Sequence, residues 1–143
     1  MFSFVSEGMP MIYNGQEAGN HKRLAFFERD AIQWQPSPYE ALYKKLLTLK
    51  KHNTALWNGE WGAVMRQVPN GDPKKIFSFV RQNGRDKVFA VFNLSGQPAQ
   101  ASFQGDLHTG SYRDFSTGAA VRVDAGSRFD MAPWSYTILV GEQ

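Results

Sequence analysis

The chain has 143 residues, of which 42% are hydrophobic and 14% aromatic, so it can bury a core and falls outside the disordered class. It contains no cysteine, which excludes a disulfide scaffold, a thiolate metal site and a cysteine nucleophile. The net charge of +3 is weak and scattered, and it does not indicate nucleic acid as a partner. No apolar run reaches the length of a membrane span, and the first residues lack the order of a signal peptide. We therefore expect a soluble protein with no membrane partner and favour the cytoplasm.

The N-terminal part reads as one β/α unit. Residues 9–13 are apolar throughout, which is typical of a strand that is buried on both faces. A polar turn follows over residues 14–19, and an amphipathic helix begins near Ser37. One such unit cannot bury its own faces. A complete (β/α)8 barrel needs roughly 200 or more residues, so the chain is too short to hold one.

The helix is marked by its capping residues and by its period. Ser37 supplies an N-cap hydroxyl, Pro38 suits the first helical position and Glu40 completes a capping box. Apolar side chains then recur with a period near 3.6, at Tyr39, Leu42, Tyr43, Leu46, Leu47 and Leu49. The solvent face is predicted to carry four lysines, Lys44, Lys45, Lys50 and Lys51. We expect the helix to end at residues 52–53.

From residue 60 onward the helical period disappears. Short β-branched and aromatic runs alternate with Gly, Asn, Asp and Pro, as in an antiparallel sandwich. Strands are predicted over residues 61–68, 76–81, 87–94, 100–104, 110–115, 120–124, 127–131 and 136–140. Turns are expected at residues 69–73 and 83–86. The second and third strands form the central pair, and the third is apolar on both faces, which indicates burial on both sides.

These elements predict a mainly β fold, in which an antiparallel Greek-key β-sandwich over residues 59–143 follows a β/α unit over residues 1–58. We expect the sandwich to fold on its own. The predicted core consists of Phe77, Phe79, Val88, Phe89, Val91, Phe92, Leu94, Phe103, Phe115, Val121, Val123, Phe129, Ile138 and Leu139.

Six segments of the chain carry motifs in a recognisable order. The first two are residues 8–19, GMPMIYNGQEAG, and residues 30–34, DAIQW. The third is the helix with its continuation to Gly59, and the others are residues 77–95, 106–110 and 131–139. Together they resemble the C-terminal part of the α-amylase family, glycoside hydrolase family 13. The matching parts are the eighth strand of its (β/α)8 barrel, the loop after that strand, the last barrel helix and the sandwich called domain C.

The resemblance implies a chain without the catalytic groups of the family. Members cleave α-glucosidic bonds by a retaining mechanism with a carboxylate nucleophile and a carboxylic acid/base. In the family these groups and a third acid follow earlier barrel strands. We therefore expect a C-terminal fragment of an α-amylase-type glycoside hydrolase acting on α-glucans, whose sandwich stabilises the missing N-terminal barrel portion. The chain alone is expected to be inactive, with no catalytic residue, cofactor or metal ligand.

By the same resemblance, Tyr13, Gly15, Gln16 and Glu17 belong to the barrel-mouth loop. We expect Glu17 to order this loop by accepting hydrogen bonds from backbone N–H groups rather than to act in catalysis. The histidines, His21, His52 and His108, lack the spacing of metal ligands.

Four aromatic side chains are candidates for stacking on the C–H faces of sugar rings, Trp57, Trp61, Trp134 and Tyr136. The alternative is that they fill the interface between the helix and the sandwich, or cap its core.

Two other functions stay open, a stand-alone carbohydrate-binding module and a self-associating structural protein; an independently active hydrolase is least favoured. Residues 9–13 would lack both neighbouring strands, and an unpaired apolar strand invites pairing with another chain. We therefore expect a homo-oligomer through residues 1–58, with the sandwiches outward. The other outcome is that the segment folds back on the sandwich.

Overall fold

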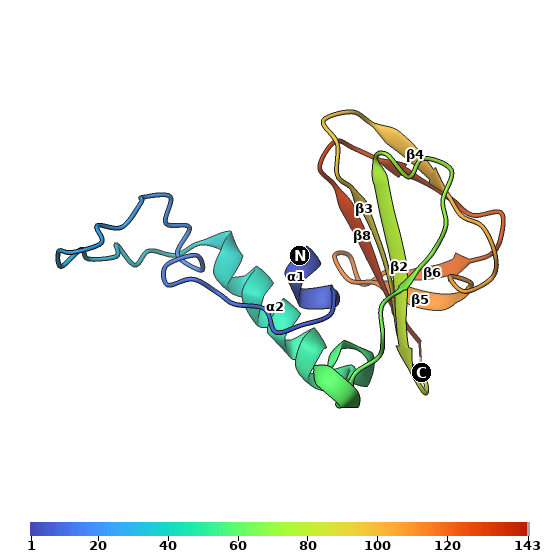
Figure 1. Cartoon of the computed structure of the whole chain (residues 1–143), viewed down its shortest axis with the longest axis horizontal. Helices are drawn as coiled ribbons and strands as arrows, with labels where there is room; N and C mark the ends of the chain where they lie inside the picture. The colour runs from blue at the N-terminus through green and yellow to red at the C-terminus, as the bar shows by residue number, and fades with distance from the viewer. Residues whose placement is uncertain (143) are drawn as a thin grey trace.

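The computed structural model describes residues 1–142, and its C-terminal part is an antiparallel sandwich (Figure 1). One sheet has six strands in the order β1-β2-β3-β8-β5-β6, and the other pairs β4 with β7. The strands are β1 (Arg66–Gln67), β2 (Ile76–Asn83), β3 (Asp86–Asn93), β4 (Ala99–Ser102), β5 (Gly110–Asp114), β6 (Ala120–Val123), β7 (Arg128–Met131) and β8 (Tyr136–Gly141). The return of β8 to lie beside β5 is the Greek-key connection.

The predicted central pair is confirmed. β2 and β3 pair along their full length, from Ile76 opposite Asn93 to Asn83 opposite Asp86. The turn between them lies at residues 84–85, where Gly84 has a φ of 58°. That conformation suits glycine, because it has no Cβ to clash with its own backbone.

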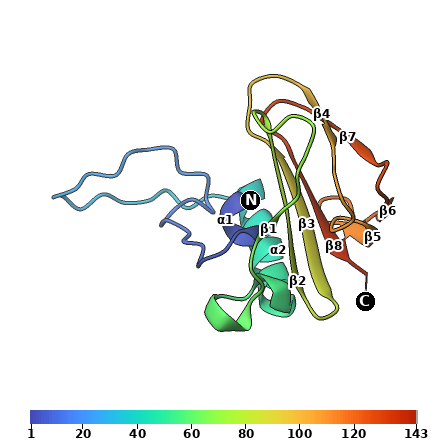
Figure 2. The ribbon, with the colours of Figure 1, turned by 45° about the vertical axis from the view of Figure 1, so that its right-hand side comes forward.

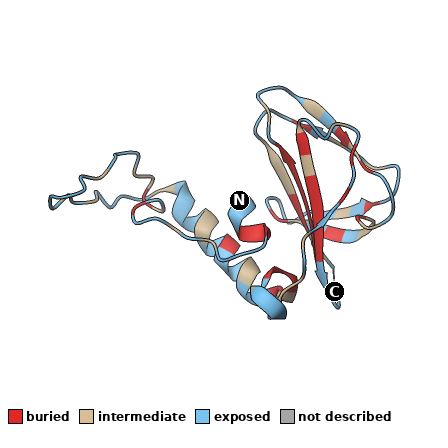
Figure 3. Ribbon diagram, in the orientation of Figure 1, coloured by how far each residue is buried: buried red, intermediate tan, exposed pale blue. Residues whose placement is uncertain are grey.

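Two apolar clusters cover the two faces of the six-stranded sheet (Figure 3). The first lies between the sheets and is built around Phe89, Phe103 and Tyr112. The second lies on the opposite face, where Phe79 and Phe92 of the sheet meet N-terminal side chains. Those side chains are Phe4, Val5, Leu46 and Leu56. The molecule therefore has three layers, with the N-terminal unit as the third.

The N-terminal unit consists of α1 (Phe2–Val5), α2 (Pro38–His52) and the 3-10 turns η1 (Thr54–Leu56) and η2 (Gly59–Trp61). In Figure 1, α1 lies between α2 and the sheet. The segment between residues 14 and 37 reaches away from the rest of the chain in both views (Figures 1 and 2). None of the helices within residues 1–142 is long and apolar enough to cross a membrane.

The prediction of a strand over residues 9–13 is wrong. These residues form neither helix nor strand, and Met9 and Met11 are 82% and 78% exposed. A strand needs a neighbour to satisfy its N–H and C=O groups, and no described segment pairs with this one. Residues 2–5 form α1 and pack on the sandwich, whereas residues 9–13, for which folding back was the second option, stay largely exposed.

The strand expected over residues 61–68 is shortened to Arg66–Gln67. The Arg81 guanidinium donates hydrogen bonds to the carbonyls of Trp57 and Ala63, which holds this segment in an irregular path. The other strands differ from their predicted bounds by one or two residues at either end. Such shifts are expected, because strand ends fray and pattern reading places them poorly.

Helix α2 begins and ends as predicted, and at its start the Ser37 hydroxyl accepts a hydrogen bond from the Tyr39 N–H at 3.3 Å. The predicted capping box is not formed, because the Glu40 side chain makes no hydrogen bond to Ser37. Lys44, Lys45 and Lys51 are exposed, as predicted, whereas Lys50 is half-buried, so the predicted solvent face is wrong for Lys50. Lys45 donates to the carbonyls of Phe115 and Ser116, and Lys50 donates to that of Leu56. Both side chains therefore tie the helix to the rest of the fold.

Most of the predicted core is buried. Ten of its members are buried, Phe79, Val88, Phe89, Val91, Phe92, Phe103, Phe115, Val123, Ile138 and Leu139. Phe77, Val121 and Phe129 are half-buried. Leu94 is 53% exposed, because β3 ends one residue before it.

Candidate functional site

The predicted barrel-mouth residues form one compact turn. The Tyr13 N–H donates to Gln16 Oε1 at 2.9 Å, and the Gln16 N–H donates to the Tyr13 carbonyl at 3.0 Å. Gly15 is buried with a φ of 92°, and a Cβ there would lie 3.1 Å from side-chain atoms of Asn20 and Ile32. The turn therefore requires glycine at this position both for its conformation and for its packing.

Glu17 does not do what the sequence led us to expect. Its Oε2 atom is buried and has no hydrogen-bond partner within residues 1–142. The side chain lines an open hollow of about 560 Å³ beside α2. Ile12, Tyr43 and Leu47 supply much of its apolar wall, and Lys44 and Lys51 lie at its edge. Gln16, rather than Glu17, supplies the side-chain hydrogen bond that orders the loop.

The exposed apolar surface is concentrated in the N-terminal unit. Between residues 9 and 47 the exposed large apolar side chains are Met9, Met11, Tyr13, Phe26, Phe27, Trp34, Tyr39 and Leu47. Phe26 and Phe27 are 89% and 95% exposed and contact mainly each other, at 4.8 Å between ring centroids. Exposed apolar side chains gathered in one unit of a chain are typical of an interaction surface.

Arg81 joins the N-terminal unit to the sandwich. Its side chain, on β2, is almost fully buried and donates to four backbone carbonyls. They are those of Ser6 at 2.7 Å, Ala63 and Trp57 at 2.8 Å, and Val5 at 3.5 Å. Burial lowers the pKa of the guanidinium, and the nearby Glu7 charge opposes that shift. One strand residue therefore fixes three separate stretches of chain.

Two further contacts strengthen this junction. Lys50 donates to the Leu56 carbonyl at 2.6 Å and to the Gly8 carbonyl at 3.3 Å. Burial, and then repulsion by Arg81, lower the pKa of Lys50. Glu7 accepts from the Met65 N–H, so the segment after α1 is bound to the chain before β1.

The four candidate sugar-stacking residues do not meet at one place. Trp57 and Trp61 lie at the junction, where their carbonyls accept from Arg81 and Asn83. Trp134 lies away from the junction, at the open end of the hairpin formed by β2 and β3. Its N–H donates to the carbonyl of Ser95, which follows β3. Tyr136 is half-buried against Phe92, 6.5 Å away between ring centroids, which favours a packing role for it.

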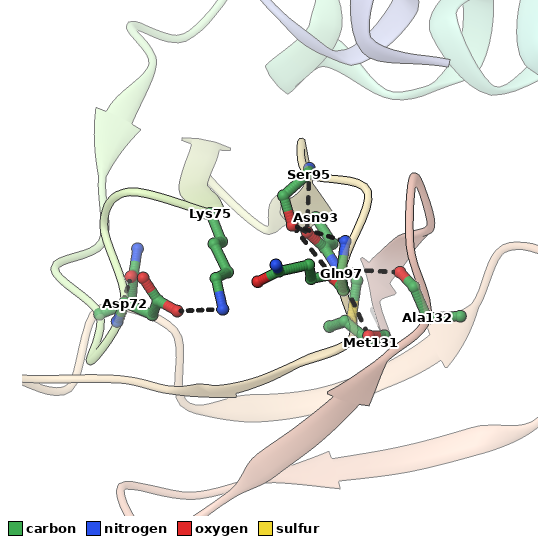
Figure 4. A network of polar contacts seen from close by, with 8 residues as sticks. Asp72, Lys75, Asn93, Ser95, Gln97, Met131 and Ala132 are labelled. Carbon is green, nitrogen blue, oxygen red and sulfur yellow. Dashed lines mark hydrogen bonds and ion pairs between the residues drawn. The ribbon is translucent and has the colours of Figure 1, made fainter.

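A buried asparagine organises the end of the sandwich near Trp134 (Figure 4). Asn93 Nδ2 donates to the carbonyls of Gln97 at 2.7 Å and Ala132 at 2.9 Å, and its Oδ1 accepts from the Ser95 hydroxyl at 2.8 Å. The same end carries the Asp72–Lys75 ion pair at 3.7 Å. The loops after β3 and β7 are thus held together from inside.

Sequence reasoning did not identify Arg81 or Asn93 as functional. Arg81 follows the apolar run of β2, and Asn93 ends β3, so a polar side chain after an apolar run was the available signal. Their partners lie up to 75 residues away, so the pattern alone could not name them. Within residues 1–142, no group of three His, Asp or Glu side chains is placed to hold a metal ion.

The comparisons with known proteins agree with this architecture. The family described as Maltogenic Amylase, C-terminal domain, matches residues 65–138. No curated protein matches the chain. Among solved structures, a noncanonic maltogenic α-amylase, AmyB from Thermotoga neapolitana, is 19% identical with a TM-score of 0.77. The match covers 98% of this chain and 34% of AmyB.

Two other solved structures show the same relation. An Anoxybacillus α-amylase is 17% identical with a TM-score of 0.75, over 99% of this chain and 31% of the enzyme. AmyP in complex with maltose is 14% identical with a TM-score of 0.69, and the match covers 97% of this chain and 32% of AmyP. The chain thus spans about a third of the length of the structures that it matches, and at these identities the likeness shows a shared fold. The family match covers more than half of the chain, which therefore belongs to the family of maltogenic amylase C-terminal domains, the domain C of glycoside hydrolase family 13.

Proposed function

We propose that the chain is the C-terminal part of an α-amylase-type glycoside hydrolase that acts on α-glucans, and that it works by supporting a catalytic barrel. In this proposal residues 1–58 are the remnant of the last β/α unit of the barrel, and residues 59–143 are domain C. The catalytic carboxylates lie in the barrel portion, so the chain alone does not hydrolyse glucans.

The observation that carries the proposal is the Arg81 junction. A sandwich that merely followed the barrel on a linker would need no such connection. Here β2 places a buried guanidinium on the carbonyls of Ser6, Trp57 and Ala63, and the second apolar cluster adds Phe4 and Leu46. The sandwich therefore fixes the position of α2 and of the chain that leads into the barrel-mouth turn.

The distribution of exposed apolar side chains indicates where the barrel would bind. Residues 9–13 lie unpaired beside the hollow along α2, and Leu47 in its wall is 47% exposed. With neighbouring barrel elements present, residues 9–13 would gain the strand partners that they lack here. A second copy of the chain is the alternative occupant, and self-association in the absence of a barrel would use the same surface.

A chimera tests the proposal. The matched C-terminal portion of AmyB is replaced by this chain, and release of reducing sugar from soluble starch is measured. We expect activity from the chimera and none from this chain alone or from AmyB lacking that portion. Hydrolysis by the isolated chain, or a folded chimera without activity, would contradict the proposal.

A matched pair of variants tests whether the barrel contacts this chain along α2. Leu47 and Leu94 are both leucines with about half of their surface exposed, at 47% and 53%. Leu47→Asp places a charge in the hollow and should abolish activity of the chimera, whereas Leu94→Asp lies on the sandwich and should not. Equal effects would mean that the barrel does not bind along α2. If Leu47→Asp changes only the light-scattering mass of the isolated chain, self-association is the function of this surface.

A further inference from the structure

We propose that the sandwich carries a binding site for an α-glucan chain at Trp134, separate from the barrel and from the junction. The choice of an α-glucan rests on the proposed function; the existence of the site rests on the observations below.

Trp134 occupies a backbone position that favours glycine. Its φ is 54°, and it is the only non-glycine residue with a positive φ within residues 1–142. The Ser135 N–H donates to the Ala132 carbonyl at 3.3 Å, so residues 132–135 form a turn with Pro133 and Trp134 at its centre. In a turn of this kind, proline is favoured at the second position and glycine at the third. A bulky side chain there is strained, and strain of this kind concentrates at ligand-binding positions.

The turn is held rigidly while its tryptophan stays in solvent. Asn93, which is fully buried, donates to the Ala132 carbonyl, and the Trp134 N–H donates to the Ser95 carbonyl at 3.0 Å. The Ser135 hydroxyl adds a bond of 2.7 Å to Ala132. Trp134 is nevertheless 70% exposed. An exposed indole on a fixed backbone offers a large apolar face at a low cost in conformational entropy, which is what the C–H face of a pyranose requires.

The surface beside this turn supplies polar groups for sugar hydroxyls. A shallow hollow of about 360 Å³ is lined by residues of β4, β7 and the start of the turn, namely Pro98, Ala99, Gln100, Asp130, Met131 and Ala132. Gln100 and Asp130 are exposed in it and joined by a hydrogen bond of 2.9 Å. Figure 4 shows Gln97, on the loop held by Asn93, with its carboxamide directed toward the ammonium of Lys75. Because Ala132 both begins the turn and lines the hollow, the hollow adjoins the turn that carries Trp134. Apolar surface with a few polar groups is the usual composition of a small-molecule site.

The position of the site leaves the barrel-facing surface free. Asn93 pairs with Ile76 at the open end of the hairpin formed by β2 and β3. Trp134 contacts the loop that follows Asn93, so it lies at this end. The other end of that hairpin, at Asn83 and Asp86, lies against the junction, where Asp86 accepts from the Thr54 N–H at 2.8 Å. A glucan bound at Trp134 would therefore not compete with a partner along α2.

Binding of maltoheptaose to the isolated chain tests the site. Indole N–H signals in a nitrogen-edited NMR spectrum are followed as the sugar is added, and cellohexaose is the comparison ligand. We expect a saturable shift of the Trp134 signal with maltoheptaose. No saturable shift, or equal binding of cellohexaose, would overturn the assignment.

Two variants separate binding from folding. Trp134→Gly suits the turn, so its midpoint of urea unfolding should be no lower than that of the native chain, while the association constant falls by about tenfold or more. Trp61→Ala removes an equally exposed tryptophan, 68% against 70%, and should leave binding unchanged. Binding that survives Trp134→Gly, or that is lost in Trp61→Ala, would place the site elsewhere. None of these outcomes alters the expected activity of the AmyB chimera, so the two proposals fail independently.

Discussion

Arg81 is the residue on which the junction depends most. Its guanidinium makes charged hydrogen bonds to four carbonyls while it is almost fully buried, so the cost of desolvating the cation opposes the gain from these bonds. Desolvation of the cation costs free energy, as its lowered pKa shows. The carbonyls would lose their partner if the side chain were removed, and we expect that loss to outweigh the relief of desolvation.

Replacing Arg81 should therefore destabilise the whole chain. Arg81→Met keeps the length of the side chain and removes the donors, and we expect the free energy of unfolding to fall by about 2–4 kcal/mol in urea. Arg85→Met, in the exposed turn between β2 and β3, is the matched control and should change it by less than about 0.5 kcal/mol. Equal stability of the two variants would show that the carbonyls find water instead.

His108 makes stability depend on pH. It is fully buried against Phe89 and Phe103, and burial lowers its pKa below the ordinary value of 6.5. Lys87 adds to this shift, and Asp106 and Asp124 oppose it. The unfolded chain therefore binds a proton at a higher pH than the folded chain does. Stability should be greatest above about pH 7 and should decline as pH falls toward 5, by at most about 1.4 kcal/mol per pH unit from this group.

Histidine variants isolate this contribution. His108→Phe keeps a ring in the core and should flatten the decline in urea midpoint between pH 7 and 5. His21→Gln removes an exposed histidine and should leave the decline as it is. If His108→Phe retains the full slope, another group is responsible.

Phe89 tests the core between the sheets. It is fully buried and contacts Phe103, Tyr112 and Phe129. Phe89→Ala should cost about 3–5 kcal/mol of unfolding free energy, because it leaves a cavity among these rings. Phe27→Ala, at a position that is 95% exposed, should cost almost nothing. An unchanged urea midpoint for Phe89→Ala would contradict the packing of the two sheets.

At the scale of elements, patterns with local signals were predictable and elements with distant partners were not. Residues 76–94 carry their own alternation and turn, so β2 and β3 were predicted to within two residues. The cap of α2 lies beside the helix, and it was predicted too. Residues 9–13 have the composition of a buried strand, but without neighbours they stay irregular. Among the site residues, the turn at Gly15 was foreseen, whereas the strain at Trp134 depends on a backbone angle that composition does not reveal.

The second apolar cluster revises one expectation about the sandwich. A fragment of residues 64–143 would lose Phe4, Val5, Leu46 and Leu56, and the sheet face beneath them would be uncovered. The sequence led us to expect autonomous folding; the structure favours a fragment that associates through this face. Light scattering should give a mass above that of the monomer, with more binding of a hydrophobic dye per mole than the full chain shows. A monomer with cooperative unfolding would restore the first expectation.

At the scale of the whole molecule, the sandwich and the N-terminal unit differ in how complete they are. Both faces of the main sheet are covered, one by the second sheet and the other by the N-terminal unit, whereas that unit leaves large apolar side chains of its own in solvent. This contrast is the reason to regard residues 1–58 as a surface that another part of an enzyme covers. The central question is therefore whether this surface gains a partner when a barrel is present.

Amide hydrogen exchange answers it most directly. Exchange of residues 9–19 and 42–51 is compared between the isolated chain and the same chain within the AmyB chimera, with β5 and β6 as the internal reference. A barrel bound along α2 predicts slower exchange of residues 9–19 and 42–51 in the chimera and unchanged exchange in the reference strands. Equal exchange of residues 9–19 in both proteins, with the chimera folded, would show that this segment gains no partner and would contradict the role that we assign to it.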